Sequence, residues 1–254
     1  MPRTLIALGV ALYGFLYAPL LVVVAFSFNR SRLNAEWTGF TLDWYRVLLN
    51  DTEMLAAAGN SLLIALASSA LATVLGTMAA LALARRRQPL LSFLALAPVA
   101  VPDILLGVSL LLLFVLLNLS LGLLSITLAH TVFSIGFVMV AVQARLAGLD
   151  PSLLEAARDL GASPWQAFRR VTLPLILPGV IAGALMAFTL SIDDFVVTFF
   201  TAGVDSPTLP LKIYAMLKTS VTPEVNAVST LLMLLTLGLI LLAHRLSPTA
   251  LRAK

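Results

Sequence analysis

Six long apolar segments constrain the fold of this 254-residue chain more than any other feature. A helix that crosses the hydrocarbon core of a bilayer needs about 20 mostly apolar residues. Charged residues make up only 11% of the chain, against about 25% in soluble domains. We therefore expect an all-α integral membrane protein with six transmembrane helices. The segments lie at about 4–28, 57–83, 90–117, 121–143, 174–200 and 225–244.

Both ends of the chain are expected in the cytoplasm. With that orientation, eleven of the 16 Lys and Arg residues lie inside and five outside, as the positive-inside rule favours. The first segment is not expected to be a cleaved signal peptide, because its apolar run is long and no small–x–small site follows Phe28. The basic residues are spread over the loops, so they indicate topology and not nucleic-acid binding.

The polar loop between the fourth and fifth segments predicts two short helices joined by a turn. Asp150 can cap the first helix, with Pro151 at its first position. Gly161 favours the end of that helix. Ser163, followed three residues later by Gln166, is a capping-box pattern for the second helix.

The first of these loop helices has one apolar face. Leu153, Ala156, Ala157 and Leu160 recur at i, i+3, i+4 and i+7, and Glu155 lies elsewhere on the helix. Such a face either binds a partner at the membrane surface or lies in the membrane interface itself. The residues alone leave both alternatives open.

Three acidic residues lie within apolar segments, where charged groups are costly and indicate function. Asp103 follows Pro98 and Pro102, which should kink its helix and free backbone carbonyls. Asp193 and Asp194 lie near the outer end of the fifth segment. Carboxylates in these places suit the path of a dehydrated ammonium substrate. Alternatively, they cap helices or pair with Arg or Lys of a neighbouring subunit.

The fifth segment also carries small residues every four positions, a pattern that predicts close helix packing. On a continuous helix Asp194 points nearly the same way as these residues, and Asp193 is turned by about 100°. The two acids should therefore differ in role. Phe188 and Phe195 can present aromatic faces to an amine, or simply contact lipid. The small residues are Gly179, Gly183, Ala187 and Ser191.

Motifs of enzymes are missing from the sequence. There is no Gly-x4-Gly-Lys-Ser/Thr, so no P-loop binds ATP on this chain. There is no His-Glu-x2-His and no Gly-x-Ser-x-Gly, which disfavours an intramembrane hydrolase. Without cysteine, thiolate metal sites are excluded. His130 is expected to hydrogen-bond a neighbouring helix and not to bind a metal.

The spacing Glu155-Ala156-Ala157, Gly161 and Val171-x-Leu173-Pro174 resembles the EAA loop of binding-protein-dependent ABC importer permeases. Further stretches resemble the C-type permease subunit of spermidine/putrescine importers, and the resemblance covers nearly the whole chain. These stretches are Asn60-Ser61-Leu62, Pro102-Asp103-Ile104, the residues 188–195, the residues 209–214 and the residues 223–227.

The resemblance implies a type I ABC importer permease fold, similar to that of methionine importers. Residues 1–56 would form the first transmembrane helix and an outer loop, 57–245 the transmembrane domain with a cytoplasmic coupling loop at 145–173, and 246–254 a cytoplasmic tail. The residues implied in coupling to an ATPase are Glu155, Ala156, Ala157, Gly161, Leu173 and Pro174. Those expected along the substrate path are Asp103, Asp193, Asp194, Phe188 and Phe195.

The resemblance also implies partners in the bacterial inner membrane. These are a homologous permease subunit, a dimer of ATP-binding subunits that carries the ATP and Mg, and a periplasmic polyamine-binding protein, with lipid around the helices. No cofactor is expected on this chain. The substrate would be spermidine or putrescine. The alternatives are another solute, such as an opine, an amino-acid derivative or ferric iron, or, less favoured, a membrane enzyme or an assembly factor.

Overall fold

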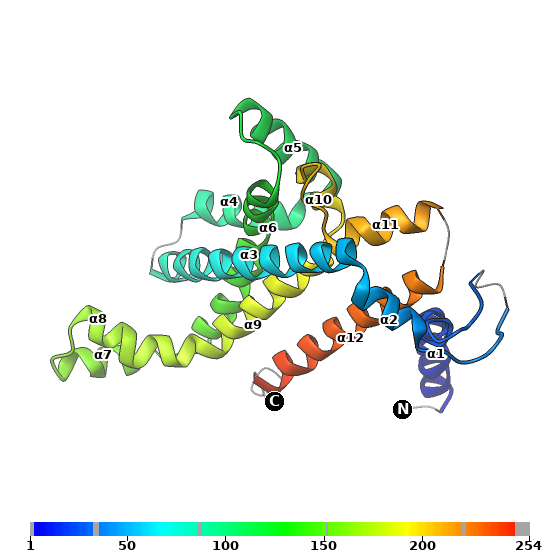
Figure 1. Ribbon diagram of the computed structural model, residues 1–254. Coiled ribbons are helices and arrows are strands. Elements are labelled where there is room, and N and C mark those ends of the chain that lie inside the picture. Colours follow the sequence, from blue (N-terminus) through cyan, green and yellow to red (C-terminus); the bar gives the residue numbers. More distant parts are fainter. Residues whose placement is uncertain (1–2, 33–35, 86–87, 151, 220–221, 247–254) are drawn as a thin grey trace. The chain divides into compact units, whose positions relative to one another are not determined.

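The fold is described by a computed structural model that covers residues 3–32, 36–85, 88–150, 152–219 and 222–246 (Figure 1). Helices make up most of these residues. Contacts within the chain divide it into two units, Met1–Ala57 with Leu211–Leu237, and Ala58–Pro210 with Gly238–Lys254. Helices α3 (Thr52–Arg85), α11 (Leu209–Thr219) and α12 (Pro223–Leu246) belong partly to each unit.

In the first unit, α1 (Arg3–Phe26) is apolar and exposed along nearly its whole length. The loop that follows is ordered around Asn29. The Asn29 side chain donates to the carbonyl of Glu36 at 2.8 Å and accepts the N–H of Thr38 at 3.0 Å. The Trp44 indole, on α2 (Asp43–Asn50), donates to the Asn29 carbonyl at 2.7 Å. Buried polar groups are thereby satisfied within the loop.

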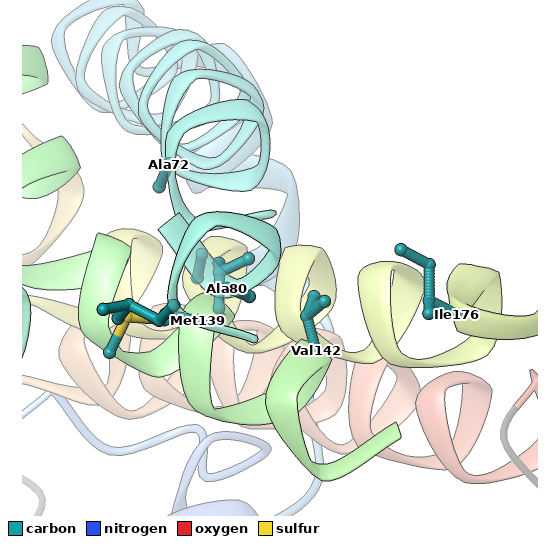
Figure 2. Close-up of a cluster of buried hydrophobic side chains, with 8 residues drawn as sticks. Ala72, Ala80, Met139, Val142 and Ile176 are labelled. Carbon is teal, nitrogen blue, oxygen red and sulfur yellow. The ribbon is translucent and has the colours of Figure 1, made fainter. Parts of the chain in front are cut away.

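The core of the second unit lies between α3, α6 (Leu123–Leu146) and α9 (Leu173–Asp193). Figure 2 shows the side chains that these three helices contribute to the core, and most of them are small or slender. A Cβ added at Gly183 would lie 3.1 Å from the Val138 Cα, and one at Gly179 would lie 3.0 Å from the Ala141 carbonyl oxygen. The predicted close packing is therefore confirmed. The buried cluster comprises Ala72, Ala80, Leu83, Val138, Met139, Val142, Ile176 and Ala187.

The third apolar segment is broken into α4 (Pro89–Ala100) and α5 (Asp103–Leu116), which meet at an angle of 113°. Val101 and Pro102 separate them, because Pro102 offers no N–H to continue the helix. The predicted kink is confirmed and is sharper than expected. By length and composition, five described helices can cross a membrane, and the bent pair supplies a sixth if it acts as one span.

The fifth apolar segment differs from the prediction at both ends. A continuous helix runs from Pro164 to Asp193, through α8 (Pro164–Ala167), a wide π-helical turn η1 (Phe168–Thr172) and α9. Pro174 thus lies inside a helix and does not begin one. At the other end the helix stops at Asp193, and α10 (Val196–Thr201) starts after a break, so a single span to residue 200 is wrong. The physical cause is the side chain of Asp194, which caps α10.

Candidate coupling loop and substrate path

The polar loop before α9 forms the two predicted helices, which lie together beside the N-terminal end of α9 (Figure 1). The backbone N–H of Ser152 donates to Asp150 Oδ1 at 2.9 Å and caps α7 (Ser152–Asp159). This hydrogen bond, with a second from the Ser152 hydroxyl, lowers the pKa of Asp150 below its usual value. The predicted cap is confirmed. Pro151 lies outside the described residues.

Gly161 ends α7 in the way the sequence predicts. Its φ of +81° lies in the left-handed region, which favours glycine. The N–H of Gly161 donates to the Arg158 carbonyl at 2.9 Å, and that of Ala162 donates to the Ala157 carbonyl at 3.0 Å. This pair of bonds is the Schellman arrangement, which satisfies carbonyls at a helix end.

The second helix carries the predicted capping box. The N–H of Gln166 donates to Ser163 Oγ at 3.3 Å, and the N–H of Ser163 donates to Gln166 Oε1 at 2.9 Å. The π-helical turn that follows is closed by the N–H of Leu173, which donates to the Phe168 carbonyl. Wide turns of this kind recur at functional sites and here precede Pro174, whose ring would crowd a regular α-helix. Leu173 is half-buried and packs against the core.

Several side chains of the loop are exposed. Glu155 and Ala156 are exposed, and Ala157 is half-buried. Leu160 and Trp165 are 89% and 66% exposed, so the loop presents large apolar groups. A groove of about 280 Å³ lies between the two helices and includes Ala157, Leu160 and Gly161 in its lining. In the described part of the chain no ion pair or hydrogen bond engages the Glu155 carboxylate.

A larger cavity of about 300 Å³ lies behind α7, where the loop meets the ends of α3 and α6. Its lining is mainly apolar and includes Leu81, Leu146 and Phe168. Leu153 also lines this cavity, whereas Leu160 lines the groove between the helices. The predicted apolar face of α7 is thus divided between an inner cavity and an outer groove.

Asp103 is the first residue of α5, at the 113° bend, and its side chain is exposed. One turn later, Gly107 allows the ring of Phe200 on α10 to come within 2.7 Å of where a Cβ would be. The helix that begins at Asp103 therefore packs closely against the helix that begins just after Asp194. The two breaks in the apolar segments belong to neighbouring elements.

The two consecutive acids at the end of α9 have different surroundings, as predicted, but the cause is the end of the helix at Asp193 and not a turn of about 100° on a continuous helix. Asp193 is the last helical residue and is exposed. Asp194 has extended backbone, with φ −70° and ψ 126°, and its side chain is 12% exposed. Its carboxylate accepts the Thr198 N–H at 2.8 Å and the Thr198 hydroxyl at 2.8 Å. Asp194 therefore caps α10, which was the alternative role considered for these acids.

His130 connects this break to the interior, and its side chain is only 1% exposed. Its Nδ1 lies 2.7 Å from Ser191 Oγ, and its Nε2 lies 2.9 Å from Thr198 Oγ1 and 3.3 Å from Asp194 Oδ2. The prediction that His130 hydrogen-bonds a neighbouring helix is confirmed. Among the described residues, no three His, Asp or Glu side chains gather in a way that could hold a metal ion.

The two aromatic residues expected along the path are both half-buried. Phe188 lies within α9, and Phe195 lies in the break, with its ring centroid 5.7 Å from that of Phe199 on α10. Phe195 is therefore close in sequence and space to both acids at the break. Phe188 lies more than one helical turn before them.

Comparison with known families decides the class of protein. The model of the family described as "Binding-protein-dependent transport system inner membrane component" matches residues 72–248. The chain belongs to this family. Its location is therefore the inner membrane, and its part in transport is that of a membrane component and not of an enzyme.

Curated members of this transport family align over most of the chain. The spermidine/putrescine transport system permease protein PotC of Escherichia coli (strain K12) is 44% identical over 91% of this chain and 89% of its own length. PotC of Haemophilus influenzae is 43% identical, covering 91% of each chain. The putrescine transport system permease protein PotI of E. coli (strain K12) is 43% identical over 87% of this chain and 82% of its own length.

Solved structures establish the fold of this family member. A chain of a bacterial ABC transporter involved in the import of the acidic polysaccharide alginate superposes with a TM-score of 0.71 at 15% identity, covering 98% of this chain and 96% of that chain. A chain of the MetNI methionine ABC transporter gives a TM-score of 0.64 at 21% identity, covering 84% and 100%. The predicted type I importer permease fold is confirmed.

Sequence reasoning missed two features of this family member. It assigned no role to Trp165, although a tryptophan beside a capping box in a polar loop is an unusual exposed apolar group. It also extended the fifth helix past Asp194. The spacing of Asp194 before Thr198 is compatible with a helix cap and could have indicated the break.

Proposed function

We propose that this chain is a permease subunit of an ATP-driven importer that moves polyamines, spermidine or putrescine, across the inner membrane. The main evidence for this substrate is the 44% identity to PotC over 91% of the chain. The exposed acids Asp103 and Asp193, both at breaks in apolar helices, support it. Ammonium groups that lose water need carboxylate partners, and a break also frees backbone carbonyls to face a cation.

The path that we propose follows the two breaks. Asp103 lies at one, and the pair Asp193 and Asp194 belongs to the other, on elements that pack against each other. Phe188 and Phe195 add aromatic faces, which attract cations through the ring quadrupole. A series of weak sites of this kind binds a polyamine tightly enough to admit it and weakly enough to release it.

The helical loop is the part that we propose to contact a separate ATPase dimer, which carries the ATP and Mg. Glu155, Ala156 and Ala157 provide an exposed polar and small-residue surface, and Gly161 fixes the turn. Leu173 and Pro174, at the start of α9, would transmit movement of the loop into the span, because one continuous helix joins them to the break at Asp193. A homologous permease subunit and a periplasmic binding protein complete the proposed importer.

Both termini face the cytoplasm in this proposal, in keeping with the eleven-to-five distribution of Lys and Arg. The helical loop then lies on the same side as the ATPase. A reporter that is active only in the periplasm, fused after Lys254, should be silent. Strong activity of that reporter would overturn the orientation.

Uptake measurements test the substrate directly. The complete transporter, with its ATPase, partner permease and binding protein, should take up labelled putrescine and spermidine in an ATP-dependent way. Unlabelled polyamines should compete, whereas an opine, an amino-acid derivative or ferric iron should not. ATP-dependent uptake of one of these other solutes, with no uptake of polyamine, would reject polyamines as the substrate. It would leave the assignment as an importer permease unchanged.

A further inference from the structure

The break after α9 separates two neighbouring acids that have the same chemistry and opposite surroundings. Helical geometry continues to Asp193 and stops at Asp194. Asp193 is exposed, and no hydrogen bond or ion pair engages its carboxylate in the described ranges. An unpaired carboxylate at the end of a transmembrane helix is stable only where it meets water or a cation. Asp193 therefore requires water or a cation beside it, and an ammonium substrate or a basic residue of a neighbouring subunit would provide the cation.

Asp194 has little capacity left for a ligand. Its Oδ2 accepts both the N–H and the hydroxyl of Thr198 and lies 3.3 Å from His130 Nε2, while its Oδ1 accepts the Val197 N–H at 3.4 Å. A carboxylate has about four lone-pair positions, and most of these are already used by donors from the chain. The structural role of Asp194 thus competes with any direct contact to substrate.

His130 lies at the centre of a continuous chain of hydrogen bonds across four helices. Ser68 on α3 donates to Ser191 Oγ on α9 at 3.0 Å, and Ser191 Oγ is 2.7 Å from His130 Nδ1 on α6. The other ring nitrogen reaches Thr198 and Asp194. If the proton of His130 is on Nε2, the hydrogen bonds all run in one direction, from Ser68 to Asp194. Each hydroxyl then donates to the next member of the series.

This chain of hydrogen bonds fixes the geometry of the break. Ser191 lies two residues before Asp193, and Asp194 lies one residue after it, so His130 contacts side chains on both sides of Asp193. The polar atoms involved are buried, and a buried donor or acceptor that loses its partner is strongly unfavourable. The arrangement is therefore rigid as long as all members are present.

We propose that His130 is a positioning residue that acts through Asp194 and the start of α10 to hold Asp193 in the substrate path, so that Asp193 is the acid that contacts an ammonium group. This inference rests on the polyamine path proposed above. In this arrangement Asp193 contacts the substrate, and Asp194 positions Asp193.

The test measures putrescine uptake by the complete transporter, with the amount of assembled complex determined for each variant. Asp193→Asn keeps the shape and removes the charge, and it should raise KM about tenfold, the effect of losing one charge-assisted hydrogen bond that remains partly solvated. His130→Ala should raise KM severalfold with kcat largely kept. His130→Gln retains an amide donor and should recover part of the loss. Asp205→Asn, which removes an exposed acid in the loop after α10, should leave KM unchanged.

The double variant distinguishes positioning from a merely structural role. In an Asp193→Asn background, His130→Ala should cause no further rise in KM, because the contact that it positions is already lost. Asp194→Asn should lower the melting temperature of the complex and should likewise add nothing to KM in that background.

Three outcomes would overturn the inference. They are a normal KM in Asp193→Asn, an additive rise in KM in the double variant, and a loss of assembled complex in His130→Ala with KM unchanged. Wild-type uptake is the separate check on the substrate. Its absence rejects the polyamine function itself, whereas normal wild-type uptake with any of the three outcomes rejects the positioning role alone.

Discussion

The helical loop of α7 and α8 and the break between α9 and α10 arrange side chains in opposite ways. In the loop, Leu160 and Trp165 are exposed, while the polar caps are satisfied within a few residues. At the break, His130 and Asp194 are largely buried, and His130 joins Asp194 and its local partner Thr198 to Ser191 from a segment more than 60 residues away in the sequence. One region exposes apolar surface, and the other buries polar groups.

Each arrangement is unfavourable unless something compensates for it, and the compensation differs. Buried polar groups at the break are covered by one another, so the chain alone stabilises them. Leu160 and Trp165 in the loop stay largely exposed within the described part of the chain, so a partner of the kind proposed above would cover them. Substitutions in the loop should therefore leave the fold intact and weaken assembly with the partner. Substitutions in the interior should instead destabilise the fold.

Reversing the charge of Glu155 should give the largest effect in this comparison. The carboxylate has no partner in the described residues and is exposed, so Glu155→Lys should not disturb the fold. A like charge or a clash at an interface costs several kcal/mol, or more than tenfold in affinity. We expect the variant to insert normally into the membrane and to lose most of the ATPase in co-purification.

Glu36→Lys is the matched control, because it reverses another exposed acid, which the proposed orientation places outside. That variant should keep the ATPase. If Glu155→Lys also keeps it, and transport is normal, the loop does not have the role that we propose.

A small substitution in the interior should come next in size. A Cβ at Gly76 on α3 would lie 2.8 Å from the Ile135 carbonyl oxygen and 2.8 Å from Val138 Cβ on α6. Overpacking of this kind costs about 1–3 kcal/mol. Gly76→Ala should therefore lower the melting temperature of the purified protein in detergent, with the ATPase still bound at low temperature.

The same helix supplies the control. Gly59 is exposed, and a Cβ added there would have no neighbouring atom within 4 Å. Gly59→Ala should be neutral or slightly stabilising, because alanine is the better helix former. Equal melting temperatures for the two alanine variants would show that α3 and α6 do not pack as closely as described.

The two regions also differ in how far the sequence predicts them. Asp150, Gly161 and the pair Ser163 and Gln166 act within three or four residues, so their roles follow from local spacing and are confirmed. The partners of His130 are 61 and 68 residues away, at Ser191 and Thr198. No local pattern specifies such pairs, because they depend on how whole helices pack.

The position of the break shows the same limit. Apolar residues continue after Asp193 and Asp194 to residue 200, so the length of the apolar segment predicts one long span. The helix stops where the Asp194 carboxylate accepts N–H groups of the next helix, and His130 from a distant segment lies beside the same carboxylate. By contrast, the bend before Asp103 was predictable, because Pro102 interrupts the helix through its own covalent structure.

The smallest expected effect concerns a cap in the loop. Ser163→Ala removes the hydroxyl that accepts the Gln166 N–H, and losing such a cap costs about 1 kcal/mol of local helix stability. Because the loop is exposed and helix α9 is held by its own packing, the melting temperature of the whole protein should hardly change.

The Ser163→Ala variant should instead change the order of the loop, seen as faster hydrogen exchange or proteolysis between Gly161 and Ala167. ATPase affinity should fall by less than tenfold, since a partner that orders the loop on binding must supply the lost free energy. A drop in melting temperature as large as that of Gly76→Ala would mean that the loop is an integral part of the folded core, and the contrast between the two regions would then be wrong.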